Sequence, residues 1–255
     1  FILSNNVPSI IEDRNGRLWF AASGGGLTRY DKESNSVTHL KHDPKNPESL
    51  STNSFFWAGK NIMKQDKNGS IWLGTIGGGL NQINPDTLTV KRYFHEPKEH
   101  ASLSSNNIRA VLPDSKERLW VGTEKGVNLR NAGEEAFTRL QMAPTGVVEN
   151  EIVMSIFEDS LGQIWVGTES NGLYLYNETT QSFTNFRFER NNPHSLASDI
   201  VHHITEDKQR RLWISHQYGL SFIDVETLRI SRHDDTKLDI TKVFIFALPA
   251  LFPDN

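Results

Sequence analysis

Residues 66–72 read Asp-Lys-Asn-Gly-Ser-Ile-Trp, an acidic residue followed six positions later by tryptophan. The same spacing recurs along the whole chain, in the five pairs Asp13/Trp19, Asp66/Trp72, Asp114/Trp120, Asp159/Trp165 and Asp207/Trp213. Successive tryptophans of these pairs lie 53, 48, 45 and 48 residues apart. A period of this length is typical of propeller blades and excludes a doubly wound or helical fold.

Each repeat reads as four short strands. Apolar residues stand three positions before the acidic residue, namely Ile10, Met63, Val111, Ile156 and Ile204, and indicate an inner strand. An Asp-to-Gly turn leads to a second strand that is apolar on both sides of Trp, and a glycine turn leads to a third. Glu117 and Arg210 replace the glycine of the first turn in the third and fifth copies, so these turns are expected to close differently or to be strained. A more polar fourth strand completes the blade.

The predicted fold is therefore an all-β propeller of four-stranded antiparallel blades, with five recognisable blades plus the start of a sixth repeat. We expect one domain over residues 1–255, with blades at about 1–43, 44–96, 97–143, 144–189 and 190–235. Residues 236–255 are expected to form an extra strand or latch, which would help five blades to close into a ring.

Composition excludes several classes of function. The net charge is −4 with no clustered basic face, so binding to nucleic acid is not expected. The chain has no cysteine, which excludes disulfides and thiolate chemistry. The longest apolar run, 243–252, contains Pro249 and is about half of what a membrane span needs. No cofactor or metal is expected, because the histidines show no recurring paired spacing.

The repeat resembles the two-component regulator propeller family. The resemblance rests on Asp66-Lys-Asn-Gly-Ser-Ile-Trp-Leu-Gly-Thr75 with Gly78-Gly79-Leu80, and on linkers such as His42-Asp-Pro-Lys-Asn-Pro-Glu-Ser-Leu50. It implies the periplasmic or extracytoplasmic sensor domain of a bacterial hybrid histidine kinase or GGDEF-type receptor. Sensors of this family commonly form seven-bladed rings. No kinase or cyclase motif is present, so this chain is expected to be non-catalytic and attached to a membrane receptor in the full-length protein.

The candidate binding residues are expected on one face around the channel of a propeller, most of them on its loops and His202 and His216 on two adjacent strands. Loops carry function more often than the strands that support them. The linkers bring polar residues such as Asn53, Asn106 and Asp199 to this face. The residues we single out for ligand binding are Trp57, Glu124, Glu169, His202, His216 and Gln217.

These residue types suit a small polar ligand such as a saccharide or peptide, or a partner protein. A homodimer of the chain is a further alternative. Two alternative functions would use the same face of the propeller. A streptogramin-lyase-like propeller would use His and Glu as general acid and base, with Glu124, Glu169, His202 and His216 as candidates. A protein-docking scaffold would use the face without a small ligand.

Overall fold

The computed structural model describes residues 2–56, 61–142, 151–217 and 219–232. Every regular element within these ranges is a β-strand, and no helix long and apolar enough to cross a bilayer occurs among them. The strands form five four-stranded antiparallel sheets, which confirms the predicted all-β fold. The start of a sixth repeat lies outside the described residues.

The five sheets follow one another along the chain, each with its strands in sequence order. The first contains β1 (Ser9–Glu12), β2 (Leu18–Ala22), β3 (Gly26–Asp31) and β4 (Ser36–Leu40). The second contains β5 (Met63–Gln65), β6 (Ile71–Gly74), β7 (Leu80–Ile83) and β8 (Val90–Tyr93). The third contains β9 (Ile108–Pro113), β10 (Leu119–Thr123), β11 (Gly126–Arg130) and β12 (Thr138–Leu140). The fourth contains β13 (Val153–Glu158), β14 (Ile164–Thr168), β15 (Leu173–Asn177) and β16 (Ser182–Phe186), and the fifth contains β17 (Val201–Glu206), β18 (Arg211–His216), β19 (Leu220–Asp224) and β20 (Ile230–Arg232).

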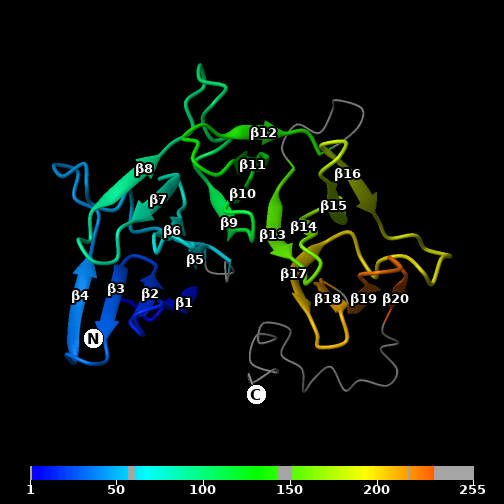
Figure 1. The fold of residues 1–255 in the computed structure, drawn as a ribbon, viewed down its shortest axis with the longest axis horizontal. Coiled ribbons are helices and arrows are strands. Elements are labelled where there is room, and N and C mark those ends of the chain that lie inside the picture. The colour runs from blue at the N-terminus through cyan, green and yellow to red at the C-terminus, as the bar shows by residue number, and fades with distance from the viewer. Residues whose placement is uncertain (1, 57–60, 143–150, 218, 233–255) are drawn as a thin grey trace.

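The sheets are arranged as an arc with the first strand of each sheet on the inside (Figure 1). Contacts run from β1 to β5, then to β9, β13 and β17. The first and fifth sheets lie at the two ends of the arc in Figure 1. The described residues therefore form an open arc and not the closed ring expected from five blades. The side chains packed between neighbouring sheets fix the angle between them, and five sheets at this angle span only part of a circle. The proposed latch, residues 236–255, lies outside the described residues.

The core lies between neighbouring sheets and is built the same way at each junction. The tryptophan of one sheet packs with the apolar residue that stands three positions before Asp in the next sheet: Trp19 with Met63, Trp72 with Val111, Trp120 with Ile156 and Trp165 with Ile204. All four of these tryptophans are fully buried. At the ends of the arc the same positions are more open, since Ile10 is 56% exposed and Trp213 is only half-buried.

The Asp-to-Gly turn is closed by the Asp side chain. In the second sheet, Asp66 Oδ1 accepts the backbone N–H groups of Asn68 and Ser70 at 2.9 Å, and Gly69 has φ of 90°. The third and fifth turns close in the same way. Glu117 and Arg210 adopt the left-handed conformation there, with φ of 63° and 58°. The expectation of strain was therefore right, and that of a different closure was wrong, because the Asp contacts hold the turn whatever residue follows.

Candidate functional site

Three of the inner strands carry a β-bulge near their first residues. In β9 the pairing register jumps from Ile108 to Ala110, and the same jump occurs at the equivalent places in β13 and β17. The residues that the register skips are Arg109, Met154 and His202, each five positions before the turn Asp. A bulge turns the extra side chain out of the regular alternation of the strand and is over-represented next to active sites. These side chains therefore differ in orientation from the apolar core residues beside them.

Arg109 is the centre of a polar and aromatic cluster. Its Nη2 donates to Glu124 Oε1 at 2.7 Å, and its guanidinium carbon lies 4.1 Å from the centroid of the Phe56 ring. Its Nη1 is 3.9 Å from Met154 Sδ, which brings two bulged residues into contact. Asn107 Nδ2 donates to Glu124 Oε2 at 2.7 Å. Both Arg109 and Glu124 remain partly exposed, so the ion pair is held in place and still faces solvent.

His202 lies beside Glu169 at the next junction. Partial burial lowers the pKa of His202 and the nearby Glu169 carboxylate acts in the opposite direction. Both residues are exposed on the surface, as is Gln217 at the end of β18. An imidazole, a carboxylate and an amide can accept or donate hydrogen bonds to hydroxyl or amide groups of a ligand.

His216 is a structural residue. Its side chain is fully buried, and its two ring nitrogens are within hydrogen-bond distance of Ile200 O at 3.2 Å and Ser221 Oγ at 2.9 Å. Burial lowers the pKa of His216 to about 4. The nearby His202 also lowers the pKa of His216, and both ring nitrogens of His216 lie within hydrogen-bond distance of protein groups.

The structure thus places Glu124, Glu169, His202 and Gln217 at accessible positions and His216 in the core. Trp57 lies outside the described residues. The prediction missed Arg109, Met154 and Phe56. Arg109 and Met154 could have been found, because the position five before Asp carries a different residue in each repeat: Pro8, Asn61, Arg109, Met154 and His202.

Several linker residues of the same face hold the scaffold. The side-chain Oδ1 atoms of Asn53, Asn106 and Asp199 accept the backbone N–H groups of His42, His95 and Phe188 at 2.7–2.8 Å. Each linker is also held by an arginine of an outer strand, such as Arg92, whose Nε donates to Ser49 O at 2.7 Å. The side chains of these polar residues therefore stabilise the linkers.

The described residues contain no group of three or more His, Cys, Asp or Glu side chains that could hold a metal ion. The bulged residues provide a guanidinium, a thioether and an imidazole, and their neighbours Glu124 and Glu169 provide two carboxylates. Such a set can bind polar groups by hydrogen bonds and by stacking.

The chain spans about a fifth of the length of the curated relative that it matches. It is 26% identical to Histidine kinase P4 of Formosa agariphila over an alignment of 276 residues, gaps included, that covers 91% of this chain and 20% of that protein. The extracellular domain of the putative hybrid two component system BT3049 from B. thetaiotaomicron matches with a TM-score of 0.64 at 20% identity, over 91% of this chain and 35% of that one. Virginiamycin B lyase from Staphylococcus aureus, in a catalytically inactive form with quinupristin, matches with a TM-score of 0.63 at 14% identity, over 89% of this chain and 69% of that one.

The two structural likenesses agree with the propeller-type arrangement of the sheets. A family model described as "Two component regulator propeller" matches residues 2–24, 102–125 and 146–170. The first segment contains the Asp13 turn and Trp19, the second Asp114 and Trp120, and the third Asp159 and Trp165. Three of the five repeats therefore match the two component regulator propeller model.

Proposed function

We propose that this chain is an extracytoplasmic sensor module of a bacterial two-component or related receptor, and that it binds a small polar ligand without transforming it. The three segments that match the family model, and the resemblance to a histidine kinase and to extracellular domains of two-component systems, support the receptor context. Attachment to a membrane receptor, and an output domain that acts on the binding signal, belong to this proposal.

The observation that carries the binding site is the set of three bulges. Scaffold positions repeat almost unchanged from sheet to sheet, as the five Asp and Trp pairs show. The bulged positions differ, with Arg109, Met154 and His202 at equivalent places. The bulged positions lie outside the regular strand pairing, and their side chains differ from repeat to repeat. Such positions are suited to recognising a particular ligand.

The chemistry of the face suits a saccharide or a peptide. Arg109 is held against Phe56 and by Glu124, so it is oriented before a ligand arrives. Preorganisation of this kind lowers the entropy cost of binding. Glu169, His202 and Gln217 offer further hydrogen bonds at the neighbouring junction.

A lyase activity is the second candidate, because the lyase fold matches and His202 lies beside Glu169. Two of the four residues considered for acid and base roles are less suitable. Glu124 is paired with Arg109, and both ring nitrogens of His216 lie within hydrogen-bond distance of other groups. The binding function is therefore the better supported of the two.

The test is a thermal-shift screen of oligosaccharides and peptides. A ligand that binds only the folded state must raise the melting temperature. Arg109→Ala and His202→Ala should abolish the shift caused by a hit, whereas Arg190→Ala, at an exposed position, should retain it. Equal shifts in all variants would refute this site. Chromatography of quinupristin after incubation with the chain tests the lyase candidate, and transformation that depends on His202 would replace the binding-only function.

A further inference from the structure

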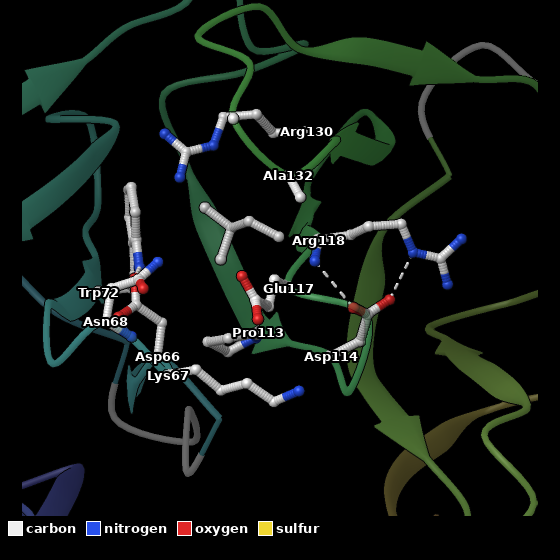
Figure 2. A pocket seen from close by; sticks show the side chains of 12 residues that line it. Asp66, Lys67, Asn68, Trp72, Pro113, Asp114, Glu117, Arg118, Arg130 and Ala132 are labelled. Carbon is white, nitrogen blue, oxygen red and sulfur yellow. Dashed lines mark hydrogen bonds and ion pairs between the residues drawn. The ribbon is translucent and has the colours of Figure 1, made fainter.

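A cavity of about 70 Å³ lies on the opposite edge of the sheets, at the junction between the second and third sheets. It is lined by side chains of the two Asp turns and of β11, among them Lys67, Pro113, Glu117 and Arg130 (Figure 2). One water needs roughly 10–15 Å³ of such space, so the cavity suits a molecule of a few non-hydrogen atoms.

At the other junctions a side chain of the next sheet accepts a backbone hydrogen bond from the Asp turn. The residue after the turn Asp donates its backbone N–H to the last side chain of the next inner strand. Ser115 N donates to Glu158 Oε2 at 2.8 Å, and Ser160 N donates to Glu206 Oε2 at 2.7 Å. Between the first and second sheets the acceptor is Gln65, which receives the N–H of Arg14 at 2.9 Å.

At the second-to-third junction this acceptor is replaced by proline. Pro113 stands at the position of Gln65, Glu158 and Glu206, and its ring has no oxygen to offer. The donor at this place is the backbone N–H of Lys67, for which we find no protein acceptor among the described residues. Lys67 uses its ammonium group instead, which donates to Ser115 O.

A second contact between sheets is also absent. Arg17 of the first sheet pairs with Asp86 of the second at 2.8 Å, and Arg118 of the third pairs with Glu178 of the fourth at 2.8 Å. Ser70 occupies the equivalent arginine position in the second sheet, and Ala132 occupies the position of Glu178 in the third. The cavity between the second and third sheets therefore lacks this ion pair as well as the acceptor.

The groups left at the cavity favour an anion. The Arg130 guanidinium lies 4.5 Å from the Trp72 ring centroid and donates to Tyr93 Oη at 3.2 Å, and its Nε is buried without an acceptor. Asp66 and Asp114 are already saturated by the turn N–H groups, by the indole N–H groups and, for Asp114, by Arg118. Glu117 is the remaining carboxylate, and Figure 2 shows it among the residues that line the cavity.

We propose that this cavity binds a small carboxylate ligand, whose carboxylate replaces the missing Glu158-type side chain on the backbone N–H of Lys67 and is attracted by Arg130. The ligand thereby bridges the second and third sheets as Glu158 and Glu206 bridge their own junctions. This site is independent of the bulged-residue face, and its occupation would stiffen the junction.

The test uses acetate as the probe on the ¹⁵N-labelled chain, with chloride at the same ionic strength as the reference. Saturable shifts of the Lys67 amide signal and of the Arg130 side-chain Nε signal are expected with acetate and not with chloride. Pro113→Glu supplies the missing carboxylate from the protein itself and should prevent acetate binding. Pro113→Ala removes the ring without supplying an acceptor and should bind acetate as the wild type does.

Two further variants test the charges. Arg130→Gln should weaken acetate binding by at least about tenfold, since hydrogen bonds to charged groups contribute the most. Glu117→Gln should tighten it, because a like charge is removed. Equal acetate binding by Pro113→Glu and Pro113→Ala, or shifts that chloride reproduces, would overturn the proposal. A higher melting temperature for Pro113→Glu than for Pro113→Ala would support the missing-acceptor explanation independently of any ligand.

Discussion

Trp72 Nε1 donates a hydrogen bond to Asp66 Oδ2 at 2.7 Å, and this contact explains the six-residue spacing that organises the chain. The same bond joins each of the other four pairs at 2.8 Å. One carboxylate oxygen closes the turn through backbone N–H groups while the other fixes the indole of the following strand. The pair therefore couples the turn to the packing between sheets.

Removing such a carboxylate should be costly. Asp159→Ala leaves the buried Trp165 indole N–H and two turn N–H groups without their acceptor. We expect a loss of about 2–4 kcal/mol in the free energy of unfolding, because buried unsatisfied donors carry their full desolvation cost. Urea unfolding measures it, with the exposed Glu33→Ala as the control. A loss as small as that of the control would contradict this role.

The two kinds of tryptophan position should differ in their contribution to stability. Trp120→Ala should lower the free energy of unfolding by about 3–5 kcal/mol through lost burial and the cavity left behind. Trp213→Ala should cost clearly less, because its ring is only half-buried at the end of the arc, where it contacts Phe222 of its own sheet at 4.7 Å between centroids. Chemical denaturation of both variants makes the comparison. Equal losses would indicate that Trp213 is covered as fully as Trp120.

The strands can be predicted from the sequence because the Asp and Trp spacing is set by local contacts within one repeat. It also places the apolar residues of the core, since their positions follow from the same register. The packing of Trp120 between sheets also follows from the sequence, because apolar residues flank each tryptophan on both sides. The open arc of five sheets does not follow from it, because the arc depends on the angle between sheets.

The candidate site was predicted less completely. The loop residues Glu124 and Glu169 follow from the position of the loop. Arg109 was missed because a bulge changes the alternation on which the strand pattern relies. His216 was predicted to line the binding face from the strand beside that of His202, whereas this last residue of β18 is buried.

Glu151 should make stability fall as the pH rises. The residue is 3% exposed and its Oε1 lacks a partner, and burial raises the pKa of its carboxyl against the opposing effect of the Asn171 and Thr168 hydrogen bonds. A raised pKa in the folded state means that its contribution is present below the pKa of the unfolded chain and is lost as the pH rises through the folded pKa. Glu151→Gln should therefore gain melting temperature relative to the wild type as the pH rises from about 4 to 7. The exposed Glu96→Gln should show no such trend, and a constant difference between Glu151→Gln and the wild type would contradict the prediction.

His216 should act in the opposite direction. Its pKa in the folded chain is about 4, well below the value of about 6.5 for an unperturbed histidine, because burial disfavours the charged imidazole. Its neutral form therefore contributes stability above the unfolded pKa, and this contribution is lost as the pH falls toward the folded pKa.

Two measurements follow. The ring signals of His216 in an NMR titration should stay those of the neutral form until the pH approaches about 4. The His216→Gln variant should lose less stability than the wild type between pH values of about 6.5 and 4, whereas the exposed His100→Gln should follow the wild type. Titration of His216 near pH 6.5 would show that its ring is solvated in the folded chain and would return it to the list of residues available to a ligand.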